Sequence, residues 1–404
     1  MSRILIFAEA VTLAHVARPI ALSRILRELG HEVCIAAAPA ADRWLAGENI
    51  ARQRIESIDS TRFLRALARG LPPYDREMLK QYVEDDLRAI AAWPPDIVIG
   101  DFRLSLYISA RLAHKPYGAI ANAYWSRRYW TGVHAPDIAS LNWLPSPVAN
   151  AVFRAVYPAA FALHALPFHA VCRHFQVTPP GRDIRDVYTA SDATAFADVE
   201  GFYEPSPAPA DAPLFIGPLP WEPPGSDVLP ELSGGPPIVF VSLGSSGDPG
   251  LLPRVLDVLA GLPVRCIVAT GVPAKQVRLP VNCVHAADFV PYAAACAASS
   301  LVICNGGAPA TYAALAGGKP VLALAGNVDQ LANMQVVART GAGMTVDWRA
   351  VERRGLPIGF QPDTVPYDRT ASRAGALAAQ VVSSIRSEAQ AVPDWIDRLS
   401  GSVR

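Results

Sequence analysis

The sequence predicts an α/β protein built from two doubly wound domains, each with a parallel sheet. Between residues 4 and 120, short apolar runs alternate with helix-period stretches, and a second alternation starts at Ile238. Strands that alternate with helices form a parallel sheet covered on both faces. A proline- and glycine-rich stretch, 204–237, separates the two sets, and 404 residues suit two domains rather than one core.

The N-terminal domain is expected to cover residues 1–210. Gly30 is placed to end the first helix, because glycine readily adopts the left-handed conformation found there. Pro94-Pro95 stops the second helix. The predicted elements in order are strand 4–7, helix 18–29, strand 32–37, helix 82–92, strand 97–99, helix 106–113 and strand 117–120.

Residues 122–175 differ from this pattern, being long, rich in aromatic residues and irregular. Most of their aromatic side chains are interpreted as helical core, and a subset could line an apolar acceptor pocket.

A linker is expected at 211–236 and a second domain at 237–380, with a helix at about 381–404 packing back on the first domain. The second domain repeats the alternation of the first. Its elements are strand 238–243, helix 253–259, strands 266–269 and 283–285, helix 293–298, strand 301–304, helix 310–316 and strand 321–324. Ligands of such sheets bind at the carboxyl ends of the strands.

Composition excludes several classes of protein. The 36 basic and 36 acidic residues cancel, so no field favours nucleic acid. Six cysteines lack metal-type spacing, and Cys34, Cys266 and Cys304 read as small buried apolar residues. No signal peptide and no apolar run of about 20 residues is recognised, so we expect a cytoplasmic protein without a transmembrane segment.

A strand at 301–304 leads into Asn305-Gly306-Gly307-Ala308-Pro309 and then a helix that begins near Ala310. Glycines allow backbone N–H groups to approach phosphate oxygens, and the helix N-terminus adds a partial positive charge. The segment alone indicates an anion site or an ordinary turn between a strand and a helix.

Its continuation resembles the nucleotide-sugar signature of the family 1 GT-B glycosyltransferases (UGT and macrolide type), HGGxGTxxEALxxGxPxxxxPxxxDQxxNA. Here the segment reads NGGAPATYAALAGGKPVLALAGNVDQLANM. Further landmarks occur in order at 215–218, 242–245 and 289–291, so the resemblance covers nearly the whole chain. It implies a GT-B fold, in which two Rossmann-like domains face each other across a cleft.

The resemblance also implies roles for single residues. Phe289 would pack on the base, the Val290 backbone would bond its edge, and Asp329 and Gln330 would bind sugar hydroxyls. The residues it places around the donor are Gly217, Ser242, Gly244, Ser245, Ser246, Phe289, Val290, Asn305, Gly306, Gly307, Ala308, Pro309, Ala310, Asp329 and Gln330.

The segment departs from the family pattern in three ways. Asn305 stands for a histidine that faces phosphate, Pro309 and Ala310 stand for Gly-Thr, and Ala313 stands for a glutamate that holds the ribose hydroxyls. Asparagine can donate a neutral hydrogen bond but carries no charge. Family members that use dTDP-deoxysugars often lack the glutamate, so a dTDP-sugar is at least as well supported as UDP-glucose.

The N-terminal half is expected to hold the acceptor. His15, interpreted as lying in the loop after the first strand, precedes Gly30-His31 by the family's spacing, although Ala14 and Arg18 replace its glycine and proline. Imidazole titrates near neutral pH and can take a proton from a hydroxyl, and Asp101 at the end of strand 97–99 would orient it. An idle, exposed loop histidine is the alternative interpretation.

Acceptor-binding residues are expected among Asn122, Tyr124, Trp125, Trp130 and His134, although core packing accounts equally well for Tyr124 and Trp125. The predicted activity is an inverting, metal-independent glycosyltransferase of the hexosyltransferase type, with no cofactor. It would transfer from a UDP- or dTDP-sugar to a hydroxyl of a lipophilic small molecule. Glu84-Asp85-Asp86 is interpreted as a solvated helix face rather than a metal site.

Three alternatives stay open: a GT-B nucleotide-sugar epimerase, a membrane-associated glycolipid synthase and a weakly active partner protein. A homodimer is compatible with the sequence.

Overall fold

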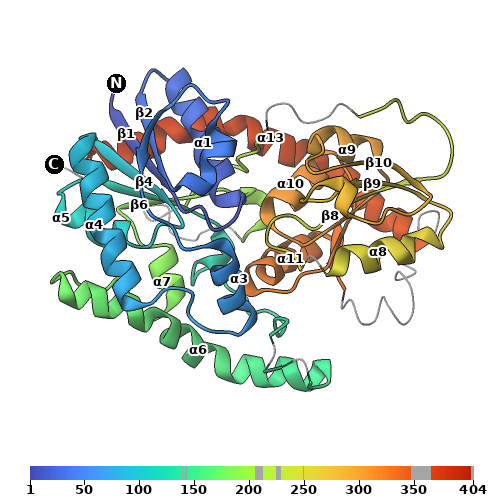
Figure 1. Cartoon of the computed structure of the whole chain (residues 1–404), viewed down its shortest axis with the longest axis horizontal. Coiled ribbons are helices and arrows are strands. Elements are labelled where there is room, and N and C mark those ends of the chain that lie inside the picture. Colours follow the sequence, from blue (N-terminus) through green and yellow to red (C-terminus); the bar gives the residue numbers. More distant parts are fainter. Residues whose placement is uncertain are drawn as a thin grey trace. The chain divides into compact units, whose positions relative to one another are not determined.

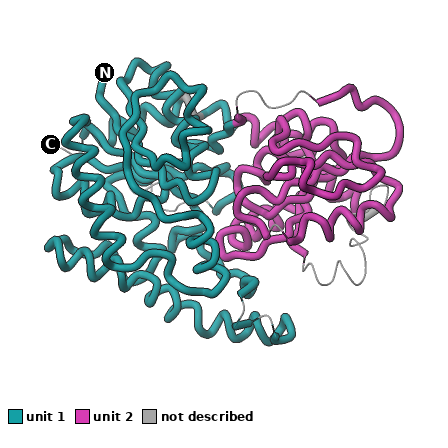
Figure 2. Tube along the Cα trace, in the orientation of Figure 1, with its two compact units in different colours: residues 1–221, 384–404 teal, residues 222–383 magenta. Residues whose placement is uncertain are grey.

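The computed structural model describes residues 1–138, 140–141, 143–204, 213–223, 229–248, 250–346 and 365–401. The chain divides into two compact units (Figure 2). Unit 1 comprises Met1–Trp221 and Ser384–Arg404, and unit 2 comprises Glu222–Ser383. The linker expected at 211–236 falls partly outside the described residues.

Unit 1 is built on a seven-stranded sheet in the order β3-β2-β1-β4-β5-β6-β7, with every pair parallel. The order reverses at β1 and β4, which lie side by side, and ligands of open α/β sheets bind at such a point. The strands are β1 Arg3–Ala8, β2 Glu32–Ala37, β3 Ala51–Arg54, β4 Ile97–Asp101, β5 Tyr117–Ala121, β6 Ala193–Phe196 and β7 Leu214–Phe215. Nearly every side chain of β1, β4 and β5 is buried, as expected of strands covered on both faces.

The helices of unit 1 are α1 Ala14–Glu28, α2 Asp42–Leu45, α3 Ser60–Ala68, α4 Arg76–Ala92, α5 Leu106–Leu112, α6 Ser146–His174 and α7 Ile184–Tyr188. The expected start of the first helix, Arg18, was wrong: α1 begins at Ala14 and contains Pro19. The proline removes only the bond that its own N–H would make to the His15 carbonyl, and the helix continues through it. His15 therefore lies in the first turn of a helix rather than in a loop.

Residues 146–174, expected to be irregular, form the 29-residue helix α6, which runs along one edge of unit 1 (Figure 1). By length and composition α6 could cross a membrane, and 28% of its most apolar window is buried. The sequence shows no uninterrupted apolar run of that length, because Arg154 and three histidines lie within the helix.

Unit 2 has a six-stranded parallel sheet in the order β10-β9-β8-β11-β12-β13. Its strands are β8 Ile238–Ser242, β9 Arg265–Ala269, β10 Cys283–Ala287, β11 Leu301–Cys304, β12 Val321–Ala323 and β13 Gly343–Thr345, and its helices are α8 Leu251–Ala260, α9 Tyr292–Ala298, α10 Ala308–Ala316 and α11 Val328–Thr340.

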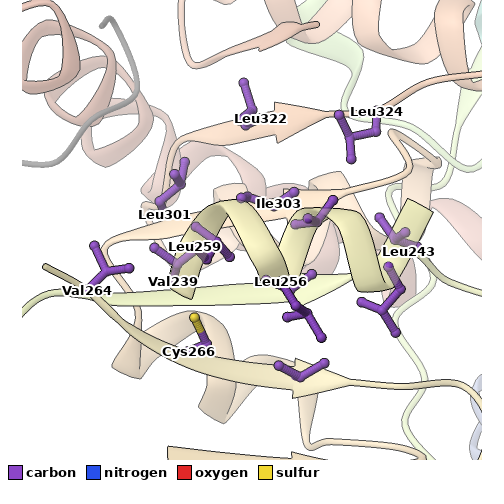
Figure 3. Packing of buried hydrophobic residues seen from close by; sticks show 14 of the residues in the cluster. Val239, Leu243, Leu256, Leu259, Val264, Cys266, Leu301, Ile303, Leu322 and Leu324 are labelled. Carbon is purple, nitrogen blue, oxygen red and sulfur yellow. The ribbon is translucent and has the colours of Figure 1, made fainter. Parts of the chain in front are cut away.

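One face of this sheet packs on α8 and forms a close-packed aliphatic core (Figure 3). Leu256 and Leu259 of α8 meet Val239 of β8, Ile303 of β11 and Cys266 of β9 there. Burial raises the pKa of the Cys266 thiol to about 12, so this cysteine behaves as a small apolar residue, as expected. The prediction of two doubly wound parallel sheets is confirmed.

The last helix, α13 Val365–Gly401, supplies residues to both units. In unit 2 the Tyr367 hydroxyl donates to the Ser300 carbonyl (2.5 Å). In unit 1 the Trp395 indole donates to the Ala193 carbonyl (2.9 Å), and its ring lies against Gly118, where an added Cβ would come within 2.7 Å.

Candidate active site

The carboxyl ends of β1 and β4 bring together the two residues expected to carry the chemistry. His15, in the first turn of α1, places its Nδ1 atom 2.7 Å from Oδ1 of Asp101, the last residue of β4. Asp101 is fully buried, whereas the His15 side chain is 20% exposed. The imidazole thus has one nitrogen held by a buried carboxylate, which leaves Nε2 as the second, available nitrogen.

Arg18, one turn further along α1, binds the same carboxylate with two hydrogen bonds. Its Nε donates to Oδ2 of Asp101 (2.8 Å) and its Nη2 donates to Oδ1 (2.7 Å). Nη1 donates to Oδ1 of Asn122 (2.8 Å), whose amide in turn donates to Asp198 (2.9 Å). The sequence had marked Arg18 only as a departure from the family pattern, but its guanidinium joins α1, β4 and the segment after β5.

The protonation of this cluster follows from its charges. Burial favours the neutral form of Asp101, but Arg18 and His15 outweigh it and lower the pKa of the carboxyl. An ionised carboxylate only accepts, so Nδ1 of His15 donates to it, and in the neutral imidazole the lone pair then lies on Nε2. Nη2 of Arg18 lies 3.1 Å from the same Nδ1 because both donate to one oxygen.

Phe102 follows Asp101 and stacks on the imidazole, with ring centroids 4.6 Å apart. Its backbone has φ of +59°, a left-handed conformation that costs a bulky residue about 1–3 kcal/mol. This backbone conformation places the Phe102 ring on the imidazole of His15. Consecutive residues, Asp101 and Phe102, therefore both contact His15.

From Phe102 a chain of aromatic contacts leads away from His15. The ring centroids of Phe102 and Tyr188 are 5.0 Å apart, those of Tyr188 and Trp125 are 4.9 Å apart, and those of the stacked Trp125 and Trp130 are 5.9 Å apart. Both tryptophans contact Phe161 of α6. His15 therefore adjoins a continuous aromatic layer within unit 1.

Trp125 and Trp130 are thus connected to His15 through Tyr188 and Phe102. Asn122 is bonded to Arg18, whereas Tyr124 is buried as a core residue would be. His134 is exposed and makes none of the ring contacts found among the described residues. Acceptor binding by these five residues stays a prediction.

A buried ionic network lies next to the His15–Asp101 pair. It is formed by Glu9, Asp86 and Arg103. Arg103 donates from Nη1 to Oε2 of Glu9 (2.8 Å) and from Nε to Oδ1 of Asp86 (2.9 Å), and all three side chains are fully buried. The Glu9 backbone N–H donates to the Asp101 carbonyl (3.3 Å), which links the network to the residue that bonds His15. The interpretation of Glu84-Asp85-Asp86 as solvated was therefore wrong for Asp85 and Asp86, because Arg103, distant in sequence, pairs with Asp86.

In unit 2 the loops after β8 and β11 meet at Asn305. Its Nδ2 donates to Oγ of Ser246 (3.1 Å), and its Oδ1 accepts from the backbone N–H of Gly307 (3.1 Å). An added Cβ at Gly244 would lie 3.0 Å from the same amide. Asn305 thus bonds both glycine-containing loops, those after β8 and β11.

Helix α10 begins at Ala308, two residues earlier than expected, with Gly307 as its N-cap and Pro309 in its first turn. Gly306 has φ of +81°, and a Cβ there would come within 2.7 Å of the Met334 side chain, so only glycine fits. Asn333 of α11 donates to the Gly306 carbonyl (2.8 Å) and to the Thr311 hydroxyl (2.9 Å), which fixes the turn.

Asp329 and Gln330 occupy the first turn of α11. Oε1 of Gln330 accepts from the backbone N–H groups of Gly326 and Asn327, and Nε2 donates to the Ser246 carbonyl (3.2 Å). Gln330 is 2% exposed, so in this structure its amide joins the loop after β8 to α11. Its predicted contact with sugar hydroxyls would require exchange of these bonds.

The other predicted donor residues are spread over both units. Ser242, Ser245, Phe289, Val290 and Ala310 lie in unit 2, at or after the carboxyl ends of β8, β10 and β11. Gly217 lies in unit 1, where a Cβ would come within 2.3 Å of the Ser384 carbonyl of α13. Donor binding by these residues stays a prediction. Among the described residues, no three His, Cys, Asp or Glu side chains are grouped to hold a metal ion.

No protein-family model matches the chain. A "PGL/p-HBAD biosynthesis rhamnosyltransferase" of Mycobacterium bovis is 40% identical over 347 residues, which is 85% of this chain and 76% of the relative. A "PGL/p-HBAD biosynthesis glycosyltransferase" of Mycobacterium tuberculosis is 37% identical over 359 residues, 88% of this chain and 83% of the relative. The chain belongs to the GT-B glycosyltransferases.

Among further matches to this glycosyltransferase is an "inactive PGL/p-HBAD biosynthesis glycosyltransferase" of Mycobacterium bovis, 36% identical over 262 residues, 64% of this chain and 70% of the relative. The structure of the spinosyn rhamnosyltransferase SpnG complexed with thymidine diphosphate has a TM-score of 0.62 at 18% identity, and the match covers 96% of this chain and 98% of that one. The two parallel sheets and this likeness agree on the GT-B fold.

Arg18, Phe102 and Tyr188 of this glycosyltransferase were not predicted as site residues from the sequence, and neither was the Glu9–Arg103–Asp86 network. The spacing of Arg18 could have indicated its role. Because α1 starts at Ala14, Arg18 lies three residues after His15 on the same face of the helix. Tyr188 and Asp198 carry no local signal, because only the folded sheet brings them to this edge.

Proposed function

We propose that this glycosyltransferase moves a deoxysugar from a dTDP-linked donor to an aryl hydroxyl of a lipophilic acceptor, with inversion at the anomeric carbon. The observation that carries the proposal is the imidazole of His15, held by an ionised Asp101 and adjoined by an aromatic layer. A neutral imidazole with one nitrogen bonded to a carboxylate is arranged to accept a proton at the other.

In the proposed reaction Nε2 of His15 takes the proton of the acceptor hydroxyl, and the oxygen attacks the anomeric carbon as the nucleoside diphosphate leaves. Asp101 stabilises the imidazolium that forms. Backbone N–H groups around Gly306 and Gly307 and the N-terminus of α10 would meet the charge on the leaving diphosphate. These groups supply the stabilisation from the protein itself, and we expect no divalent metal to be required.

An aryl acceptor is supported by the side chains next to the base. An aromatic ring binds well against other rings in stacked or edge-to-face contacts, which the sequence Phe102–Tyr188–Trp125–Trp130 offers. Phenols also lose their proton far more readily than alkyl alcohols, with an unperturbed pKa of about 10, so a neutral imidazole suffices as base. The PGL/p-HBAD relatives point to the same broad kind of acceptor.

A dTDP-deoxysugar is supported by Ala313 and by the comparisons. Ala313 lies on α10 where the family's glutamate would hold both ribose hydroxyls, and thymidine offers one hydroxyl fewer. One relative is a rhamnosyltransferase, and SpnG, of the same fold, is complexed with thymidine diphosphate.

Calorimetric titration with dTDP and UDP tests this donor assignment. We expect the wild type to bind dTDP at least tenfold more tightly. Ala313→Glu should restore the ribose contact and narrow that difference, whereas Ala313→Gln, of similar size, should narrow it less because it lacks the charge. A wild type that prefers UDP would remove the argument.

The inactive relative raises the question of whether this chain has lost activity. In this chain the His15–Asp101 hydrogen bond is intact, and Asn305, at the position of the family's histidine, bonds both the loop after β8 and the turn at Gly307. Both observations favour an active enzyme.

A further inference from the structure

The outer face of α6 carries a row of exposed apolar side chains. Val148, Val152, Val156, Ala159, Leu163 and Leu166 recur every three or four residues, and all are exposed. That spacing places them on one face of a helix, over a length of about 27 Å at 1.5 Å per residue. We call these six residues the α6 stripe.

Exposed apolar side chains are concentrated at the stripe rather than spread evenly over the described surface. Six of the thirteen large apolar side chains that are exposed in the described residues lie between Trp143 and Leu166. Val152 and Leu163 are 39% and 59% exposed, and Trp143, just before the helix, is 77% exposed. Contiguous apolar surface of this kind marks a site that something else covers.

The segment that carries the stripe has charges of one sign, although the whole chain is neutral. No acidic residue occurs between Asp137 and Asp183, whereas Arg154, Arg173 and Arg182 do. All three arginines are exposed. An apolar stripe with a tryptophan at one end, on a segment whose charged residues are all basic, suits the interface of an anionic bilayer.

We propose that the α6 stripe docks unit 1 on an anionic lipid bilayer, with α6 lying in the plane of the interface. The helix does not span the bilayer, because its other face belongs to the core of the unit. Phe153, Phe161, Phe168 and Val171 are buried where α6 packs on α4 and α7. A spanning helix would have to withdraw these side chains from the core.

The inner face of the same helix continues into the acceptor layer. Phe161 contacts both Trp125 and Trp130, and the ring contacts continue from Trp125 through Tyr188 and Phe102 to His15. One helix therefore separates the docking surface from the aromatic layer next to the base. Docking would bring an acceptor anchored in the bilayer to that layer; this last step rests on the proposed function, whereas the docking itself does not.

Vesicle flotation with the full chain tests the proposal. We expect the wild type to float with vesicles that contain phosphatidylglycerol and much less with pure phosphatidylcholine vesicles. Val152→Glu/Leu163→Glu should reduce binding to the anionic vesicles more than tenfold, because two apolar side chains that would be buried in the bilayer are replaced by charged ones. Val281→Glu, the same change at an exposed valine of unit 2, is the matched control and should bind like wild type.

Equal binding by wild type and Val152→Glu/Leu163→Glu, or no binding of the wild type to anionic vesicles, would overturn the proposal. So would a wild-type dimer in light scattering that this double variant dissociates, because a second copy would then cover the stripe. Val152→Asn/Leu163→Gln serves if the glutamates prevent folding. Transfer to a short soluble phenol should survive in the double variant; its absence in a wild type that binds vesicles would count against the proposed function alone.

Discussion

Replacing His15 with alanine should lower kcat for sugar transfer by about 10²- to 10⁴-fold, the usual contribution of a positioned general base. The imidazole of His15 adjoins the aromatic layer, and its hydrogen bond to the buried Asp101 leaves Nε2 to accept a proton. Alanine has no group that can accept the proton of the acceptor hydroxyl. The measurement is steady-state turnover at saturating donor, together with calorimetric titration of dTDP.

Titration separates this loss from a general defect. The predicted phosphate-binding loops belong to unit 2 and His15 to unit 1, so His15→Ala should bind dTDP as the wild type does. His174→Ala, at an exposed histidine, should retain both turnover and binding. Asp101→Asn should lower kcat in the same direction, because the amide can present an N–H to Nδ1 and favour the tautomer whose Nε2 is protonated. Unchanged turnover in His15→Ala would refute the base assignment.

Arg103→Met should lower the free energy of unfolding by about 3–5 kcal/mol at pH 8, the usual cost of removing one partner of a buried ion pair. Methionine fills much of the volume but leaves the carboxylates of Glu9 and Asp86 buried without their cation. Because Glu9 is bonded to the Asp101 backbone, we expect activity to fall as well. Urea unfolding of both proteins measures the difference.

The deficit of Arg103→Met should shrink as the pH falls. Burial raises the pKa of Glu9 and Asp86 above their ordinary values of 4.5 and 3.8, and Arg103 opposes that rise. Without Arg103 the folded pKa values rise further, so the folded variant holds protons that the unfolded chain has released, and its stability increases with falling pH. A pH-independent deficit would contradict this account. Arg88→Met, at an exposed arginine paired with Asp85, is the control and should cost less than about 1 kcal/mol.

Much of the fold was predictable because parallel strands are buried on both faces and appear as apolar runs. Residues 301–304 and 238–243 illustrate this, since every residue of β11 and β8 is buried. Shorter, exposed strands such as β3 carry no such pattern and were missed. Helical core was expected within 122–175, but the bounds of α6 were not predicted. Its apolar residues lie on both faces, so the periodicity that marks an amphipathic helix is weak there.

The His15–Asp101 pair was predictable because both residues stand near the carboxyl ends of strands, which meet at one edge of a parallel sheet. Arg18 and Arg103 were not, since their partners are distant in sequence and a charged residue is ordinarily exposed. A buried arginine can be found only when the fold supplies its carboxylates.

The most direct test of the central claim is the mass of the product formed by the purified chain from dTDP-rhamnose and a p-hydroxybenzoate ester. We predict a product that is heavier than the ester by one deoxyhexosyl group, with release of dTDP, and a much smaller yield from UDP-glucose. Conversion of the donor without a glycosylated ester, or glycosylation from UDP-glucose alone, would contradict it.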